Sequence, residues 1–226
     1  MASRVTTEEI AQTSLFKGFT LDQVKDLLSR TGVLVKHFHR NDYVYLAGDN
    51  IDNLCVVING KVQIIKEDIA GEKSILGTLE PGDTFAENNF AARTHSVLSY
   101  SVVDDSDIFM LNFGRLTMKI IQNPELFSKF FHNLMEISGQ NTAKLLAKVD
   151  ILGKRSLRGK IMAYLEQEAQ LHNSPTFELP FNRTDMANYL DADRSAMTRE
   201  LCKMRDEGLI KFEKNVFMIK VGISNE

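Results

Sequence analysis

Residues 182–199, which read NRTDMANYLDADRSAMTR, limit the fold of this chain more than any other stretch. Their spacing predicts two short helices joined by a tight turn. Asn182 and Asp193 are suited to cap the two helices, because each offers a side-chain oxygen to the free N–H groups of a first turn. Apolar residues at helical spacing give both helices an inner face, namely Met186, Ala187 and Leu190, then Ala196, Met197, Leu201 and Met204.

The outer side of the second helix is polar near its N-terminus, where Arg194, Ser195, Thr198 and Arg199 lie. This is the end that a recognition helix presents to base edges in the major groove of DNA. The alternative is an ordinary helical hairpin with exposed arginines. The residues that follow favour DNA binding.

Residues 209–213 and 216–220 predict two short strands around Lys214 and Asn215. A hairpin directly after two such helices is a winged arrangement. Its lysines, Lys211 and Lys214, are suited to contact phosphate.

Length and composition predict a folded protein of one large or two modest domains. The chain has 226 residues, of which 43% are hydrophobic. Its apolar runs are far shorter than the ~20 residues of a membrane span, and its polar N-terminus does not resemble a signal peptide. Two distant cysteines, Cys55 and Cys202, fit reduced thiols. We therefore expect a cytoplasmic protein without a membrane partner.

The formal net charge of −3 argues against indiscriminate nucleic-acid binding. The acidic excess lies in the first 150 residues, whereas basic and acidic residues nearly balance in the remainder. Affinity for DNA must therefore come from clustered arginines and from the symmetry of a dimer.

The first half of the chain changes from a helical to a strand period. Residues 6–31 predict one or two helices, and residues 33–111 predict short strands interrupted by glycines. These glycines, at positions typical of the corners of an antiparallel barrel or roll, are Gly48, Gly60, Gly71, Gly77 and Gly82. Residues 54–58 and 61–65, around Asn59-Gly60, give the strongest hairpin signal.

Residues 124–150 predict a long helix with one apolar seam. The seam positions are Phe127, Phe130, Leu134, Ile137, Asn141, Leu145 and Val149. Such a seam pairs with its own copy in many proteins, and one polar Asn141 would set the register. The alternative is a seam that packs inside its own chain. Residues 151–153 predict a hinge, and residues 156–170 a further helix before a loop at 173–175.

The order of roll, long helix and winged helix-turn-helix resembles the CRP/FNR family of bacterial transcription regulators. Residues 76–87, 156–165 and 182–210 carry this resemblance. It implies an α+β fold with an N-terminal antiparallel β-roll of the cupin-like or cyclic-nucleotide-binding-like kind. A long dimerisation helix and a C-terminal winged helix-turn-helix domain would follow. The expected domains are residues 1–123, 124–152 and 153–226.

The resemblance implies an effector-responsive homodimer that binds an inverted repeat in double-stranded DNA, with RNA polymerase as a further candidate partner. Arg194, Ser195 and Arg199 fall on the base-contacting positions of the family, with Thr198 between them, and Arg183 falls on a phosphate-contacting position. Arginine suits guanine because its fork matches O6 and N7. Family members often carry glutamate where this chain has Ser195. We therefore expect guanine opposite Arg199 in a half-site that differs from the family consensus.

The resemblance also places the effector pocket, at Leu76, Gly77, Ala86, Glu87, Arg93, Thr94, Leu145 and Leu146. Ala86 stands where cyclic-nucleotide members have a glycine that permits close backbone approach. Leu145 and Leu146 are apolar where those members hydrogen-bond the base. The expected effector is therefore a small molecule other than cyclic AMP. Arg93 has a second interpretation, as an ion-pair partner of Glu87.

No cofactor and no metal site is predicted. An iron–sulfur cluster needs about four cysteine ligands, and the chain has two. His95 is the one interesting candidate for a haem ligand. His37 and His39 share a strand face and could hold a metal, but no nearby cysteine or carboxylate cluster completes a site, so we interpret them as surface residues.

An enzyme is not expected, because the chain lacks a G-x-S-x-G elbow, a P-loop and an H-E-x-x-H motif. Two alternatives stay open. A pure ligand-binding module would explain residues 1–150 but leave the winged helix-turn-helix unexplained. A regulator that needs no effector fits the same residues.

Overall fold

The computed structural model describes residues 5–31, 34–68, 71, 73–87 and 95–220. The chain forms two compact units, Met1–Thr142 and Ala143–Glu226, and each is described by itself. Among the helices of the described ranges, none has both the length and the apolar character needed to span a membrane.

The first unit opens with short helices that share one apolar side. They are α1 (Thr7–Ala11), the 3-10 helix η1 (Ser14–Phe16) and α2 (Leu21–Thr31). A capping box fixes the start of α1, because Thr6 and Glu9 each accept a hydrogen bond from the other's backbone N–H. The prediction of helices in this stretch is confirmed.

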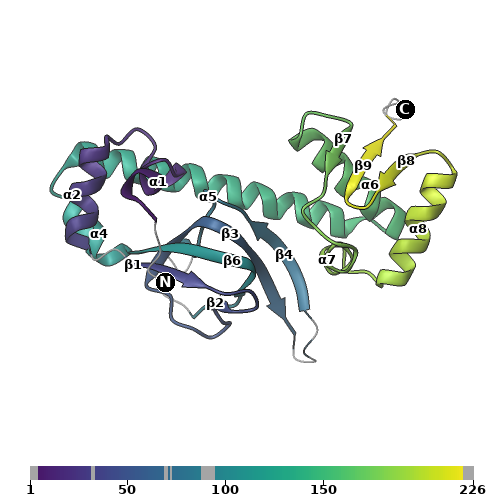
Figure 1. Ribbon diagram of the computed structural model, residues 1–226, viewed down its shortest axis with the longest axis horizontal. Helices are drawn as coiled ribbons and strands as arrows, with labels where there is room; N and C mark the ends of the chain where they lie inside the picture. Colours follow the sequence, from purple (N-terminus) through teal and green to yellow (C-terminus); the bar gives the residue numbers. More distant parts are fainter. Residues whose placement is uncertain (1–4, 32–33, 69–70, 72, 88–94, 221–226) are drawn as a thin grey trace. The chain divides into compact units, whose positions relative to one another are not determined.

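An antiparallel sheet forms the body of the first unit (Figure 1). Its strands are β1 (Leu34–Phe38), β2 (Tyr43–Tyr45), β3 (Asn53–Glu67), β4 (Lys73–Leu79), β5 (Thr84–Phe85) and β6 (Ser99–Asn112). They run in the order β1-β6-β3-β4, with β2 paired to β6 and β5 paired to β3. The expected antiparallel roll is confirmed.

The expected hairpin at Asn59-Gly60 is wrong, because β3 continues through both residues as one strand. Its pairing with β6 shifts register between Val57 and Val62, as at a β-bulge. Gly60 has φ +86, and a Cβ at this position would collide with Ser106 of β6. Glycine is therefore required by the close approach of β6 and not by a chain reversal.

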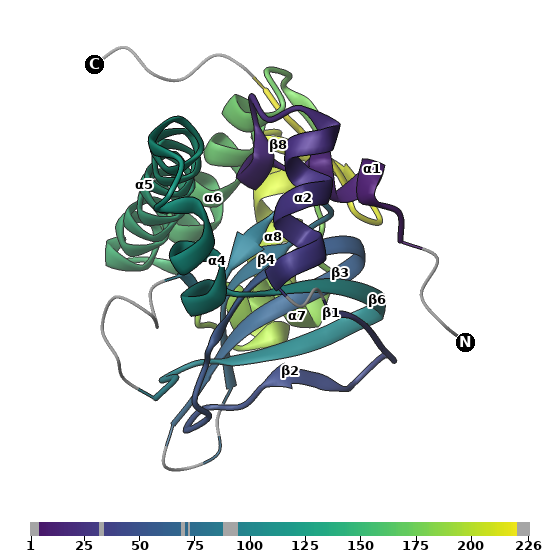
Figure 2. The ribbon, with the colours of Figure 1, turned by 90° about the vertical axis from the view of Figure 1, so that its left-hand side faces the viewer.

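Two apolar layers lie on opposite faces of β3, as the alternation of a strand requires. Cys55 and Val57 point into the roll with Phe38, Phe85 and Tyr100. The other layer joins β3 and β6 to the helices, and it includes Leu54, Val56, Ile58, Phe109, Leu111, Phe16, Leu27 and Leu116. Figure 2 shows α1, α2 and the strands of this unit from its end.

Two further helices follow β6. The first, α4 (Phe113–Ile120), is capped by Asn112, which accepts a hydrogen bond from the backbone N–H of Arg115. We did not predict this helix. The second, α5 (Pro124–Gly153), confirms the expected long helix, and the boundary between the two compact units falls within it.

The N-terminal part of the predicted seam of α5 packs inside its own chain, which is the alternative interpretation of these residues, whereas Leu145 and Val149 of the same seam are exposed. Phe130 and Ile137 are buried in the core of the first unit, and Phe127 and Leu134 pack against that core. Asn141 donates hydrogen bonds within the first unit, so its amide does not serve as a free register group. The N-terminal part of α5 faces the core of the first unit because η1, α4 and the sheet supply matching apolar side chains there.

The second unit contains α6 (Leu157–Leu171), β7 (Thr176–Glu178), α7 (Arg183–Tyr189), α8 (Arg194–Asp206), β8 (Ile210–Glu213) and β9 (Val216–Ile219). The helices and the β8–β9 hairpin are as predicted, whereas β7, which pairs with β9, was not. Three aromatic rings, Tyr164, Phe181 and Tyr189, form mutual contacts with centroid separations of 5.0–6.1 Å. They join α6 to α7 in the core of this unit.

Candidate DNA interface and effector pocket

Side-chain caps fix the starts of both helices of the helix-turn-helix. Asn182 accepts hydrogen bonds from the backbone N–H groups of Thr184 and Asp185, each at 2.9 Å. Asp193 accepts one from Ala196 at 2.7 Å. These oxygens satisfy donors that would otherwise lack partners at a helix start. The predicted caps are therefore confirmed.

The turn between α7 and α8 is held by a lysine of α6. Lys160 Nζ donates to the carbonyl oxygens of Leu190 at 3.1 Å and Asp191 at 3.4 Å, and so stabilises the C-terminal end of α7. Asp191 has φ 48, the left-handed conformation that lets the chain reverse.

A second contact from α6 holds α8 itself. Arg158 Nε donates to Glu200 at 2.6 Å, and its two terminal nitrogens donate to Glu207 at 2.7 and 2.8 Å. The hydrogen bonds from Arg158 also lower the pKa of Glu207. A planar guanidinium fork that binds two carboxylates fixes orientation as well as distance. The recognition helix is thus attached to α6 near its middle and just beyond its C-terminal end.

The outward face of α8 carries the residues predicted to contact DNA. Arg194, Ser195, Thr198 and Arg199 are all exposed. Within the described part of the chain, neither arginine forms an ion pair, since Glu200 is bound by Arg158 and Asp206 by Arg205. Thr198 donates its hydroxyl to the Arg194 carbonyl at 2.8 Å, so the hydroxyl oxygen faces outward mainly as an acceptor.

The wing is a two-residue hairpin with Lys214 at φ 51 in its turn. Lys211 and Lys214 are exposed, as the phosphate-contact prediction requires. Arg183 has partners within the wing. Its guanidinium donates to the Lys214 carbonyl at 2.9 Å and lies 4.9 and 4.7 Å from the ring centroids of Phe212 and Phe217.

Arg183 therefore holds the wing against α7, and its contact with phosphate stays a prediction. Partial burial lowers its pKa, which is consistent with a guanidinium packed on aromatic rings. The sequence position at the start of α7 did not reveal this, because the two rings come from strands about thirty residues further on.

The predicted effector cassette lies just after β5 in the first unit. Ala86 is buried and has φ 68, a left-handed conformation that favours glycine. Glu87 is 8% exposed. Asn141 donates to its Oε1 at 2.7 Å and also to the Thr84 carbonyl at 3.3 Å. A side chain of the same chain thus already occupies the acidic group expected to bind an effector.

The other predicted pocket residues belong to different parts of the chain. Leu76 and Gly77 lie on β4 and are half-buried. Leu145 and Leu146 belong to the second compact unit and are exposed. Arg93 and Thr94 lie outside the described residues, and so does any pairing of Arg93 with Glu87.

The remaining sensor candidates are placed as follows. Cys55 is fully buried, and burial raises the pKa of its thiol to about 12. A thiol of this kind stays protonated and reacts slowly. His95 is exposed.

His37 and His39 are exposed, as expected for surface residues, and each lies beside a carboxylate. Asp107 on β6 lies 3.0 Å from His37 Nδ1, and Asp105 lies 3.6 Å from His39 Nδ1. These carboxylates are about seventy residues away in the chain and become neighbours only through the pairing of β1 with β6.

An antiparallel roll is followed by a winged helix-turn-helix, whose exposed Arg194 and Arg199 form no ion pair among the described residues. This architecture is that of a DNA-binding transcription regulator with a sensor domain. Two family models agree with this description. The cyclic nucleotide-binding domain matches residues 35–122, and the Crp-like helix-turn-helix domain matches residues 159–221. The chain belongs to the CRP/FNR family, whose members are transcription regulators and not enzymes.

Individual relatives are distant but similar along most of their length. The transcriptional activator protein FnrL of Cereibacter sphaeroides is 24% identical, over 94% of this chain and 80% of its own. The cyclic AMP receptor protein of Thermus thermophilus is 22% identical, over 87% of this chain and 88% of its own. The structure of a CooA variant from Carboxydothermus hydrogenoformans has a TM-score of 0.73 at 16% identity, covering 96% of this chain and 92% of that one.

Proposed function

We propose that this regulator reads an inverted repeat as a homodimer, with Arg194, Ser195 and Arg199 of α8 contacting bases. The observation that supports this proposal is that these side chains are exposed near the N-terminus of α8. The neighbouring carboxylates are bound by other arginines, Glu200 by Arg158 and Asp206 by Arg205. An arginine that forms no ion pair with any described residue is available for the bidentate contact to guanine. Lys211 and Lys214 would bind phosphate and position the helix.

A selection of random duplex DNA on the purified protein at moderate salt tests this proposal. We expect an enriched inverted repeat whose arms are about one helical turn apart, each with a guanine. Enrichment of a single unrepeated site would contradict the dimer, and enrichment that persists in an Arg194→Ala, Arg199→Ala double variant would contradict the contact residues.

The proposed dimer contact is the C-terminal part of the predicted seam of α5, where apolar side chains are exposed, together with the neighbouring Leu146. Leu145, Leu146 and Val149 are 45, 64 and 66% exposed in the single chain. Large apolar side chains grouped on an exposed helix are typical of a protein–protein contact. A second copy of this helix is the occupant that two-fold DNA recognition requires.

Sedimentation of the purified protein checks this contact. The wild type should be dimeric, whereas a Leu146→Glu, Val149→Glu variant should be monomeric because each copy would place carboxylates against its partner. Gln140→Glu, which adds a negative charge elsewhere on α5, is the matched control and should stay dimeric. A monomeric wild type would contradict the proposal.

For the sensor we propose a small-molecule effector other than cyclic AMP. Ala86 adds a methyl group where close backbone approach is needed, and Asn141 already binds Glu87. Calorimetric titration with cyclic AMP should therefore show no saturable binding at micromolar concentration. Tight binding of cyclic AMP that also raises affinity for the selected DNA would refute this part.

The hydrogen bond between Asn141 and Glu87 favours a second candidate, a regulator that needs no effector. Here the contact from α5 to the cassette would do the work that a ligand does elsewhere. If so, the protein purified without small molecules should bind the selected site with full affinity, and cell extract should not increase that affinity.

Because the proposed function is exerted on DNA, we propose the cytoplasm as the location of this protein.

A further inference from the structure

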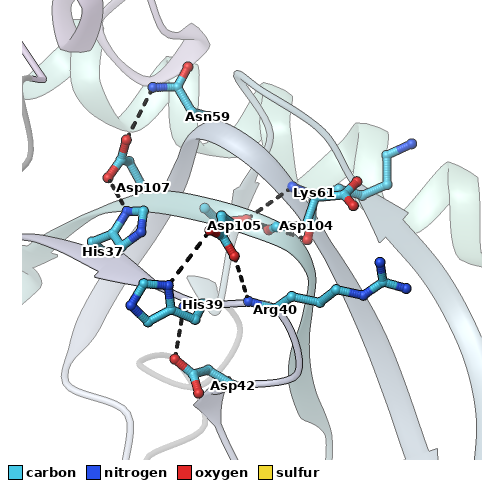
Figure 3. Close-up of polar contacts among 10 residues, drawn as sticks. His37, His39, Arg40, Asp42, Asn59, Lys61, Asp104, Asp105 and Asp107 are labelled. Carbon is cyan, nitrogen blue, oxygen red and sulfur yellow. Dashed lines mark hydrogen bonds and ion pairs between the residues drawn. The ribbon is translucent and has the colours of Figure 1, made fainter.

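A cluster of two histidines and two aspartates lies on one face of the β1–β6 ribbon (Figure 3). His37 is directly opposite Asp107 in the antiparallel register. Asp105 precedes Asp107 by two residues on β6, so the two carboxylates share a face. His39 lies directly after the end of β1, and its ring contacts the ring of His37. The register therefore groups residues that the sequence separates.

The ligand atoms of His37, His39 and Asp105 are close enough to share one ion. One atom from each residue lies within 4.8 Å of the others, and among the described residues this is the group of metal-binding type that meets that criterion. The two imidazole rings are 4.9 Å apart between centroids, at an angle of 82°. His39 and Asp105 are 75 and 61% exposed in their side chains, so both can rotate inward onto an ion.

Hydrogen bonds from neighbouring groups orient this cluster. The backbone N–H of Arg40 donates to Asp105 Oδ1 at 2.8 Å, which leaves Oδ2 toward His39 and lowers the pKa of this carboxyl. Asp107 contacts one ring nitrogen of His37 and accepts from Asn59 Nδ2 at 3.3 Å. A carboxylate on one imidazole nitrogen is the outer-shell arrangement that fixes the tautomer of a metal-bound histidine.

The charges around the cluster favour a cation. Asp42 accepts a hydrogen bond from the His39 backbone at 2.8 Å, and Asp104 is adjacent to Asp105. The long cationic side chains of Arg40 and Lys61 extend away from the imidazoles in Figure 3. An incoming ion therefore meets acidic side chains before it meets a competing positive charge.

From this arrangement we propose that the roll carries a divalent transition-metal site, with His37, His39 and Asp105 as ligands and Asp107 as the group that orients His37. Two imidazole nitrogens and one carboxylate oxygen suit zinc, nickel or copper better than magnesium or calcium, which prefer oxygen ligands alone. Three protein ligands leave at least one coordination position for water. This site is separate from the effector cassette and does not depend on the function proposed above.

Occupancy of the site would link the loop after β1 to β6. An ion that binds only the folded roll stabilises it by mass action, in proportion to the logarithm of its concentration. The expected consequence is a melting temperature that rises with added zinc and falls again with a chelator.

The test uses untagged full-length protein, freed of metal on a chelating resin, because a histidine tag would bind the same ions. Calorimetric titration with zinc chloride should give one ion per chain, and the His37→Ala, His39→Ala double variant should lose it. Asp105→Asn should weaken binding at least tenfold, and Asp107→Asn by about 10–100-fold, as outer-shell changes do elsewhere. His132→Ala, an exposed histidine on α5, is the control and should bind as the wild type does.

Absence of saturable zinc binding at micromolar to sub-millimolar concentration would overturn the proposal. Unchanged binding in the double variant would overturn it as well. All substituted side chains are solvent-accessible, and circular dichroism in metal-free buffer confirms that each variant is folded.

A measurement on the wild type does not depend on any variant. The chain has five histidines, and each gives separate imidazole resonances in a nuclear magnetic resonance spectrum. Zinc should shift the resonances of His37 and His39 together, at one equivalent, and leave those of the other histidines in place. Shifts spread evenly over all histidines would indicate only nonspecific association and would reject the site.

Discussion

The recognition helix and the effector cassette differ in the exposure of the charged side chains that are predicted to bind a partner. On α8, Arg194 and Arg199 are exposed while the neighbouring acids are bound by other arginines. In the cassette, Glu87 is buried and receives a hydrogen bond from Asn141 of the same chain. The first arrangement leaves groups ready for an external partner, whereas the second has supplied a partner internally. DNA binding is therefore better defined by the residues than effector binding is.

The largest expected effect concerns Lys148, an exception in the DNA-binding unit because it is a buried cation. It is 4% exposed, and its Nζ lies 3.1 Å from the ring centroid of Tyr189, with no hydrogen-bond partner among the described residues. Lys148→Met should raise the free energy of unfolding by about 1–4 kcal/mol. Urea denaturation measures this, with the exposed Lys203→Met as control.

The stabilisation by Lys148→Met should depend on pH. Burial lowers the pKa of Lys148 from 10.5 to about 7, while Asp191 and Lys160 nearby act in opposite directions. Between these two values the unfolded chain holds a proton that the folded one lacks. Wild-type stability should therefore rise with pH relative to the variant, by at most about 1.4 kcal/mol per pH unit. Below pH 7 the difference should be constant; a constant difference from pH 7 to 9 would contradict the assignment.

Arg199→Ala tests the role of the exposed arginines of α8. Loss of one bidentate contact should weaken binding to the selected site by about 1–3 kcal/mol and relax the preference for guanine at one position. Fluorescence anisotropy with the selected site and with single-base variants measures both effects. Arg205→Ala removes an arginine from the far end of the same helix and should leave base preference unchanged. Equal losses in the two variants would mean a general charge effect.

Asn141→Ala tests the hydrogen bond to the buried Glu87 of the effector cassette. The substitution removes the donor to a buried carboxylate, which should cost about 1–3 kcal/mol of unfolding free energy. If the hydrogen bond also replaces an effector, DNA affinity should fall in the same variant. Asn133→Ala is a useful comparison, because Asn133 also lies on α5 but donates to the backbone of Leu15 and Lys17. Unchanged stability of the Asn141 variant would show that Glu87 has another partner.

Ala86→Gly should have the smallest effect. Glycine relieves the left-handed conformation but loses a buried methyl group and gains freedom in the unfolded chain, so the net change should stay below about 1 kcal/mol. A thermal melt measures it. A substantial gain of cyclic AMP affinity in this variant would show that the methyl group alone had closed the cassette.

The parts of the fold that sequence predicted correctly are those set by local patterns. Caps at Asn182 and Asp193 and helical periodicity located α7 and α8. The prediction of a hairpin at Asn59-Gly60 is wrong, because the same dipeptide suits both a hairpin turn and a β-bulge. The choice between them depends on β6, about forty-five residues away in the chain.

The site residues also divide into those that local sequence patterns predict and those that depend on contacts between distant segments. Exposure of Arg194 and Arg199 follows from helical spacing alone. The contacts of Arg183 with Phe212 and Phe217 depend on how the wing folds back, and the pairing of His37 with Asp107 depends on strand register. Neither leaves a signal in a short window of sequence, because both join elements that are distant in the chain.

The attachment of α8 through Arg158 has a consequence for how such regulators diversify. Both of its carboxylate partners, Glu200 and Glu207, are residues other than those proposed to contact bases. Under that proposal, Ser195 could be exchanged while the helix keeps its position. A lineage that carries this attachment would then acquire new operators by substitutions at one or two codons without rebuilding the domain.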